Sequence, residues 1–317
     1  LSEKYVGKSK YGLFITNRLL RIYPVYWIVL LLTAGLSVNP AFTHIFGFSL
    51  YDYLGETSPL SLGSRIYLAL SNLILFGQDL VLFQGVDSGG HIYFTSNYRE
   101  SAYGLYTFMA LPQAWTLSVE MIFYLLAPFL IRMRTFSLLA LLCSSLLLRG
   151  YIYFGAGLYQ DPWTYRFFPT ELAFFLSGMV SYRLYLKINE KTLNWVPPLL
   201  TTGFIVTLTL VFQFLPGQAI KQWGYYCLIL ASMPLLFIFS KRYRSIDGYI
   251  GELSYPIYIS HIVVIFLLSP FLNRISPSEN ITAIVCVSTI IFSLLLVRFI
   301  TGPIERYRQS RARGSAV

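Results

Sequence analysis

The sequence predicts an all-α protein, a polytopic bundle of membrane helices. Of its 317 residues, 56% are hydrophobic and only 12% are charged, whereas about a quarter of the residues in a typical soluble domain are charged. Long runs without Asp, Glu, Lys or Arg recur, among them 22–38 and 253–273. Runs of about 20 such residues cross a bilayer as helices. They lack the alternation of apolar and polar residues that membrane β-barrels require.

Nine apolar segments can be drawn, and we expect them to form one transmembrane domain over residues 1–317. The segments are 19–38, 66–84, 114–131, 135–154, 167–186, 194–215, 222–240, 250–273 and 281–302. Pairs of turn-forming residues separate several of them, namely Asn39-Pro40, Pro216-Gly217, Ser276-Pro277 and Gly302-Pro303.

The net charge of +10 does not indicate a nucleic-acid partner, because the basic residues cluster in short loops between apolar segments. Such loops follow the third, fifth, seventh and ninth segments. Membrane proteins keep basic loops on the cytoplasmic side. We therefore expect these four regions, including the C-terminus, to be cytoplasmic. The basic residues concerned are Arg132, Arg134, Arg183, Lys187, Lys191, Lys241, Arg242, Arg244, Arg306, Arg308, Arg311 and Arg313.

The number of crossings follows from the charges at the two ends. Basic residues also precede the first segment, so both ends are expected inside and the number of spans must be even. Nine segments are one too many. The weakest is 66–84, which carries Asn72, Gln78 and Asp79. We therefore expect about eight spans plus one re-entrant or interfacial segment, which is tolerated where it lines a polar cavity.

Cysteine chemistry and metal binding are not expected. The three cysteines, Cys143, Cys227 and Cys286, lie within apolar segments and have no metal-ligand spacing. We interpret them as packing residues, and we expect no bound metal and no resident cofactor.

The first candidate site is the pair Arg18 and Arg21, in the run Arg-Leu-Leu-Arg-Ile-Tyr-Pro-Val-Tyr-Trp. The two residues share a helical face because they are three positions apart. Paired guanidinium groups suit phosphate. The alternative is that they only anchor the cytoplasmic end of a span. Tyr23, Tyr26 and Trp27 then fit an interfacial aromatic belt.

The second candidate is Glu120, a carboxylate inside the apolar segment 114–131. A charge at membrane depth costs several kcal/mol, so it rarely persists without a partner or a task. Thr116, Glu120 and Tyr124 lie on one helical face, and such a carboxylate either takes up a proton or orients a general base. The alternative is a structural ion pair with an arginine of a neighbouring helix.

The third candidate is His261, which shares a helical face with Ser254 and Tyr258. Histidine acts as a base near neutral pH, but a lone histidine is more often a hydrogen-bonded core residue. Arg166 and Glu171 bracket the start of the fifth segment. We expect each of them to belong to an ion pair whose partner the sequence does not reveal.

Four motifs, in order across residues 18–261, resemble those of the acyltransferase 3 family, bacterial membrane enzymes that O-acylate cell-surface sugars. The chain is similar to the family at Arg18 to Tyr26, at Trp115-Thr-Leu-Ser-Val-Glu120 with Tyr124, at Phe175-Leu-Ser-Gly178-Met, and at Leu253-Ser-Tyr-Pro-Ile-Tyr-Ile-Ser-His261. Any one of these motifs alone is a weak signal, whereas four in order are specific.

The resemblance implies transfer of an acyl group, in the first instance acetyl, from cytoplasmic acyl-CoA to a sugar hydroxyl outside. The acceptor would be a cell-surface glycan, an exopolysaccharide or a lipid-linked sugar, and the location would be the bacterial inner membrane. Arg18 and Arg21 would hold the donor, while Glu120 and His261 would be catalytic. Supporting residues would be Trp115, Thr116, Tyr124, Ser254, Tyr258, Arg166 and Glu171.

The aromatic loop 85–112 is expected outside, where it would either contact a glycan or form an interfacial lid. Its residues of interest are His91, Tyr93, Tyr98, Tyr103 and Tyr106. Membrane lipids are the remaining expected partner of the chain.

The chain also departs from the family pattern. The family opens with two helices ahead of the paired arginines, and the first carries an Arg and a His that is taken to be the essential base. Neither helix is found in residues 1–317. We therefore expect the chain to be N-terminally truncated relative to the family and inactive on its own. It also reads Glu305-Arg306-Tyr307 where the family tends to have Glu followed shortly by Pro.

The alternative function is a transporter or flippase for a lipid-linked sugar, which would use the same intramembrane charges as a pathway. Transporters of this kind have inverted repeats with matching broken helices. The sequence shows no such internal symmetry.

The expected topology can be tested by thiol labelling of a cysteine-free variant in sealed cells. Ile188→Cys and Tyr243→Cys lie in basic loops and should stay unlabelled by an impermeant reagent until the membrane is opened. Ser88→Cys, in the expected outer loop, is the control and should react at once. Labelling at position 188 or 243 in sealed cells would overturn the topology.

Overall fold

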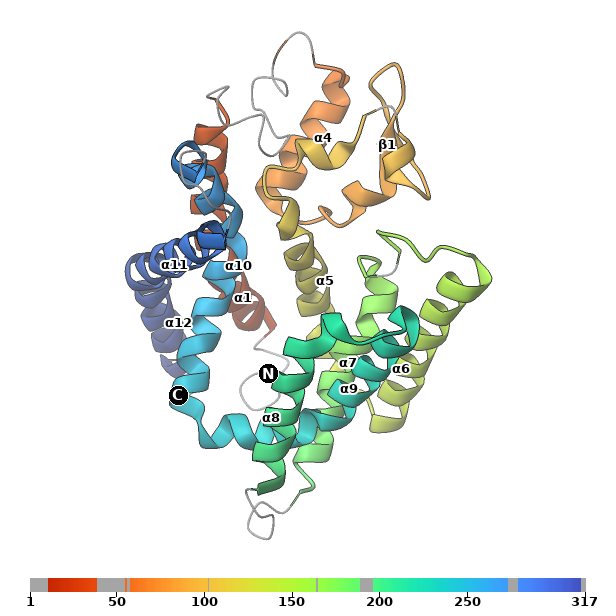
Figure 1. Cartoon of the computed structure of the whole chain (residues 1–317), viewed down its shortest axis with the longest axis vertical. Coiled ribbons are helices and arrows are strands. Elements are labelled where there is room, and N and C mark those ends of the chain that lie inside the picture. Colours follow the sequence, from red (N-terminus) through yellow and green to blue (C-terminus); the bar gives the residue numbers. More distant parts are fainter. Residues whose placement is uncertain are drawn as a thin grey trace. The chain divides into compact units, whose positions relative to one another are not determined.

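The computed structural model describes residues 11–38, 55, 58–101, 103–163, 165–188, 196–272 and 279–314, and helices dominate it (Figure 1). The predicted all-α polytopic membrane fold is confirmed. The main helices are α1 (Tyr11–Leu36), α4 (Leu62–Ile74), α5 (Trp115–Leu130), α6 (Thr135–Gly150), α7 (Phe168–Tyr185), α8 (Val196–Val211), α9 (Gln218–Arg242), α10 (Arg244–Leu272), α11 (Glu279–Leu296) and α12 (Gly302–Gly314). A short hairpin is formed by β1 (Gln84–Val86) and β2 (Ile92–Phe94).

Seven helical stretches among the described residues are long and apolar enough to cross a membrane. They are Tyr11–Leu36, Pro112–Leu130, Thr135–Gly155, Val196–Phe214, Lys221–Lys241, Gly248–Phe271 and Ile281–Arg311. The eighth expected span corresponds to α7, which has 18 residues but includes Glu171 and Arg183 and is not among these seven. α4 has only 13 residues, so the prediction that 66–84 is not a full span is confirmed.

One predicted boundary is wrong, because the chain does not break at Gly302-Pro303. A π turn, Val297–Thr301, joins α11 to α12 directly, with the backbone N–H of Gly302 bonded to the carbonyl of Val297. In a regular α-helix the proline ring would clash with the carbonyl four residues back. A wider turn just before Pro303 gives the ring room. The turn at Pro216-Gly217 is present, with Gly217 at a φ of 75°. Asn39-Pro40 and Ser276-Pro277 lie outside the described residues.

The chain packs as two compact units. The first comprises Leu1–Pro128, Ile152–Phe168 and Gly251–Val317, and the second comprises Phe129–Tyr151 and Pro169–Ile250. Whether the chain forms a single domain stays a prediction.

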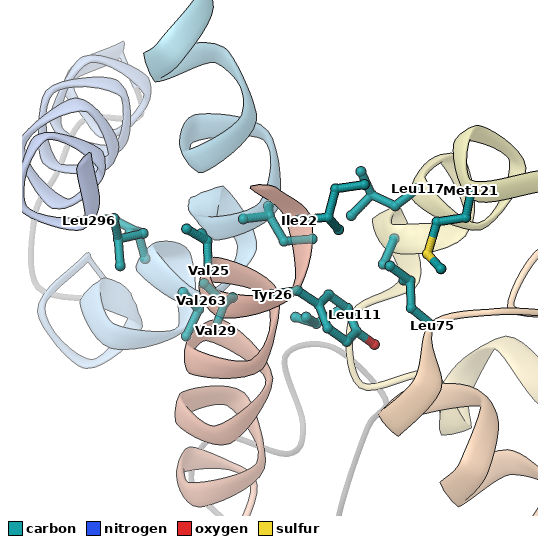
Figure 2. Close-up of a cluster of buried hydrophobic side chains, with 13 residues drawn as sticks. Ile22, Val25, Tyr26, Val29, Leu75, Leu111, Leu117, Met121, Val263 and Leu296 are labelled. Atoms are coloured by element: carbon teal, nitrogen blue, oxygen red, sulfur yellow. The ribbon is translucent and has the colours of Figure 1, made fainter. Parts of the chain in front are cut away.

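The core of the first unit lies where α1, α5, α10 and α11 meet the turn after α4 (Figure 2). Side chains spaced three or four residues apart on α1 form one apolar stripe toward this core, as expected for a helix with one buried face. The buried members labelled in the figure are Ile22, Val25, Tyr26, Val29, Leu75, Leu111, Leu117, Met121, Val263 and Leu296.

The residues between α1 and α5 form a small lobe with a core of its own. Leu68 of α4, Val81, Val86 and Leu105 are fully buried in it. The tip of the β1–β2 hairpin rests on the start of α4, where Ser64 donates to the carbonyl of Gly90 at 2.7 Å. Gly90 has a φ of 78°, and a Cβ there would lie 2.5 Å from the carbonyl oxygen of Pro59. Only glycine fits this approach.

The second unit contains an ion pair between α6 and α7. Arg149 donates to the carboxylate of Glu171 at 2.8 Å, and both side chains are largely buried. The guanidinium group also lies over the rings of Phe174 and Tyr226. Glu171 therefore has an arginine partner, as the sequence predicts, and that partner is Arg149.

The last turn of α4 is closed by side chains of α1. The Tyr26 hydroxyl donates to the carbonyl of Asn72, and the Tyr23 hydroxyl donates to that of Ile74. Trp27 Nε1 donates to the carbonyl of Leu73 at 3.0 Å. The remaining carbonyl of the turn, that of Ser71, accepts from the N–H of Leu75 at 2.9 Å. All four terminal carbonyls, which a helix cannot satisfy internally, have donors.

Tyr26→Phe should destabilise the protein, because it removes the donor to the Asn72 carbonyl in a fully buried position. A buried acceptor left without a partner costs about 1–3 kcal/mol. The apparent unfolding temperature in detergent should therefore fall by several degrees. Tyr151→Phe, at an exposed tyrosine, is the matched control and should melt like the parent. Equal melting of both variants would contradict the proposed closure of α4.

Candidate functional site

The paired-arginine motif lies within α1, which begins well before the predicted boundary at residue 19. Arg18 is half-buried and Arg21 is exposed. The guanidinium group of Arg18 lies over two rings, 5.4 Å from the centroid of Phe14 and 5.1 Å from that of Tyr124. Such cation–π contacts contribute about 0.5–2 kcal/mol each. Arg18 is therefore held in place by rings of α1 and α5.

Glu120 and Tyr124 connect this arginine to the second motif. The Tyr124 hydroxyl donates to the Glu120 carboxylate, one helical turn back on α5. Both Arg18 and Arg21 interact electrostatically with Tyr124. Glu120 is therefore linked to Arg18 through Tyr124. The sequence did not predict this neighbourhood, because the two motifs are far apart along the chain.

The fourth motif, on α10, contacts α1 and the start of α5 through its tyrosines. Tyr255 donates to the carbonyl of Ile22 in α1 at 2.6 Å and interacts electrostatically with Glu120. Tyr258 donates to the carbonyl of Gln113, just before α5, at 2.6 Å. α1, α5 and α10 therefore meet along one line of polar contacts inside the first unit.

Thr116 completes the contact between α5 and α10. Its hydroxyl donates to the hydroxyl of Tyr258 at 2.9 Å. Nearby, Gln113 Nε2 donates to the carbonyl of Ile259 at 2.9 Å. The predicted face of Thr116, Glu120 and Tyr124 is thus occupied by neighbours on two helices.

The structure does not bring every predicted residue to Glu120. The ring of His261 is half-buried, and its Nδ1 lies 2.7 Å from the carbonyl of Tyr258 in its own helix. When Nδ1 donates this bond, Nε2 is the basic nitrogen. The exposed Ser254 donates to the carbonyl of Gly251 in the same helix. Among the contacts of the described residues, neither side chain reaches Glu120.

Arg166 and Trp115 lie at the other end of the line of contacts. Arg166 pairs with Asp161, with its Nε 2.5 Å from Oδ1, and its guanidinium group lies 4.5 Å from the ring centroid of Trp115. The expectation that Arg166 belongs to an ion pair is confirmed. Gly178 and Phe175, from the remaining motif, lie on α7 in the second unit.

Several polar residues at this site were not singled out from the sequence as functional. Ser118, inside the motif on α5, donates to the buried carboxylate of Asp79 at 2.6 Å and accepts from the N–H of Gly77 at 2.9 Å. Gln78 donates to the hydroxyl of Tyr26 at 3.1 Å. The signal was the polarity of 77–79 inside an apolar segment. This polarity indicated that the segment does not span the membrane, but it did not show which helix the side chains of 77–79 contact.

Comparison with known proteins identifies the family of the chain. A relative from Aquifex aeolicus (strain VF5), described as an uncharacterized protein, is 27% identical over 218 residues, covering 64% of this chain and 92% of the relative. No solved structure matches the chain. The sequence profile of the acyltransferase 3 family, described as an acyltransferase domain, matches residues 4–298. The chain therefore belongs to the acyltransferase 3 family of membrane proteins.

Proposed function

We propose that the protein transfers an acyl group, in the first instance acetyl, from cytoplasmic acyl-CoA to a hydroxyl of a cell-surface or exopolysaccharide sugar. It would do so in a bacterial inner membrane, with its C-terminus in the cytoplasm. The observation that carries the proposal is the meeting of Arg18 with the Tyr124–Glu120 pair. Arg18 would then bind phosphate of the same donor whose acyl transfer Glu120 assists. Family membership supports acyl transfer as the reaction.

Arg18 and Arg21 are the proposed donor site. Coenzyme A carries several phosphate groups, and arginine binds phosphate through paired, charge-assisted hydrogen bonds. The rings of Phe14 and Tyr124 hold the Arg18 guanidinium in place before the donor arrives. A preorganised group loses less conformational entropy on binding. Arg21 is exposed on the same helical face and supplies a second guanidinium group with paired hydrogen-bond donors.

Glu120 is the proposed orienting carboxylate. In the reaction, the sugar oxygen attacks the thioester carbon, the carbon–sulfur bond breaks, and the thiolate of coenzyme A leaves. A base takes the proton of the sugar hydroxyl and then delivers it to the thiolate. Glu120 holds the imidazole of that base in its productive orientation. That histidine is the one that the resemblance places ahead of Arg18, because the ring of His261 contacts the carbonyl of Tyr258 and does not reach Glu120 among the described contacts.

The acceptor is proposed to meet the lobe between α1 and α5. Tyr93, Tyr103 and Tyr106 are each close to half exposed, and tyrosines combine an apolar face with a polar hydroxyl, as contact surfaces often require. A glycan or a lipid-linked sugar would reach the line of contacts from this side. Thr116, which follows the lobe-packed Trp115 on α5, and its partner Tyr258 are the proposed supporting hydroxyls.

Glu120→Gln should abolish most of the transfer without unfolding the protein. The change keeps the shape of the side chain and removes its charge, so the acylation rate should fall by roughly 10²-fold, the scale of acid–base contributions. The rate is measured on the protein expressed from its whole gene and is normalised to folded protein. Glu252→Gln, on the exposed part of α10, is the control and should keep the parent rate. Near-parental transfer by Glu120→Gln would reduce Glu120 to a packing residue, and loss of folded protein would favour a structural role.

Arg18→Ala and Arg21→Ala should each weaken binding of coenzyme A by about tenfold or more, because a hydrogen bond to a charged group contributes about 1.5–3 kcal/mol. Isothermal titration calorimetry of the purified protein in detergent measures this affinity without turnover. Arg132→Ala, at an exposed arginine, is the matched control and should bind like the parent. Equal losses in all three variants would show a diffuse charge effect instead of a site.

A further inference from the structure

A buried ion pair lies in the segment between the π turn Tyr151–Gly155 and α7, outside the seven spans. Arg166 approaches Asp161 with two nitrogens, Nε at 2.5 Å from Oδ1 and Nη2 at 3.1 Å from Oδ2. The side chain of Arg166 is 15% exposed and that of Asp161 is 9% exposed. Two parallel bonds fix the plane of the guanidinium group, which a single bond would leave free to turn.

The carboxylate of Asp161 also bonds a residue of the lobe. The Tyr98 hydroxyl donates to Asp161 Oδ2 at 2.9 Å, and burial raises the pKa of Tyr98, so this donor stays protonated at neutral pH. Close by, Trp163 Nε1 donates to the carbonyl of Ser96 at 2.8 Å. The segment with the ion pair is therefore joined to the lobe at two places.

The fixed guanidinium plane meets the start of α5. It lies 4.5 Å from the ring centroid of Trp115 and 4.9 Å from that of Tyr165. On another side, Trp115 packs against the buried core of the lobe. The indole ring of the first residue of α5 is thus held by the lobe core and by Arg166.

The turn that begins with Trp115 carries the contacts of the proposed site. Thr116 donates to the Tyr258 hydroxyl, and Glu120 follows four residues later, about 6 Å along the helix axis. A shift of Trp115 would move both residues. A misplacement of about 1 Å at a reacting group can lower a rate about 10²-fold.

We propose that Asp161 and Arg166 are positioning residues for acyl transfer: they fix the first turn of α5 from outside the membrane and so set the place of Thr116 and Glu120. The proposal rests on the proposed function. A stabilising role alone accounts less well for the pair, because a buried ion pair often adds little net stability compared with apolar residues of similar volume. In contrast, two hydrogen bonds to Asp161 and stacking on Trp115 are the contacts that keep the Arg166 guanidinium group and the indole ring in one orientation.

Three variants test the proposal. Arg166→Met removes the charge and the fork, Arg166→Lys keeps only the charge, and Arg99→Gln is the control. Arg99 approaches the same Asp161, but at 3.8 Å and with a side chain that is 64% exposed, and such surface pairs contribute little. All are compared with the parent, expressed from the whole gene, for affinity for coenzyme A, turnover at saturating donor, and hydrogen exchange of the backbone amides of residues 113–120.

Arg166→Met should keep the coenzyme A affinity within about twofold and lose about 10²-fold in turnover, with faster exchange in 113–120. Arg166→Lys should fall between Met and the parent, and Arg99→Gln should match the parent in all three measurements. Turnover that falls only in proportion to folded protein, or exchange that does not change in Arg166→Met, would overturn the positioning role. A parent that transfers no acyl group, with exchange still faster in Arg166→Met, would refute the proposed function and leave only a structural contact.

Discussion

The closing of α4 by α1 is the contact on which the rest of the first unit depends. A helix that ends against the middle of another helix leaves its last carbonyls away from water, and a buried carbonyl without a donor is costly. Three side chains of α1, Tyr23, Tyr26 and Trp27, supply those donors. Because α4 can end there, the chain turns back at Leu75, whose φ of 69° marks the reversal. The turn then brings Gln78 to α1 and Asp79 to Ser118 of α5.

Side-chain hydroxyl groups that bond main-chain carbonyls of neighbouring helices also occur at the candidate site. Tyrosines of α10 donate to main-chain carbonyls of its two neighbours, Tyr255 to Ile22 and Tyr258 to Gln113. Both hydroxyl groups join helices by bonding main-chain carbonyls, so a motif residue with a hydroxyl group need not be catalytic. The charged groups left for chemistry are Arg18, Arg21 and Glu120. Arg18 and Glu120 meet at Tyr124, which joins the first two motifs into the proposed donor site with its carboxylate.

Much of this fold could be predicted because hydropathy and charge are local properties of the sequence. The apolar runs gave the helices, and the polar residues Asn72, Gln78 and Asp79 correctly marked 66–84 as too weak to span. Partners across helices could not be predicted in this way. Arg166 and Glu171 lie close together in sequence, yet they pair with Asp161 and Arg149. On sequence alone Tyr23, Tyr26 and Trp27 fit an interfacial belt equally well, because periodicity shows which helical face a side chain occupies but not which carbonyl it bonds.

The central claim is that the donor binds at Arg18 and Arg21 with its thioester directed toward Glu120. The most direct measurement is an experimental structure of the protein, expressed from its whole gene, with a non-hydrolysable acyl-CoA analogue. The account predicts phosphate oxygens of the analogue within hydrogen-bonding distance of both guanidinium groups, and its acyl end near the Tyr124–Glu120 pair. An analogue bound against the lobe or elsewhere, with Arg18 still resting on Tyr124 and no phosphate beside it, would contradict the account.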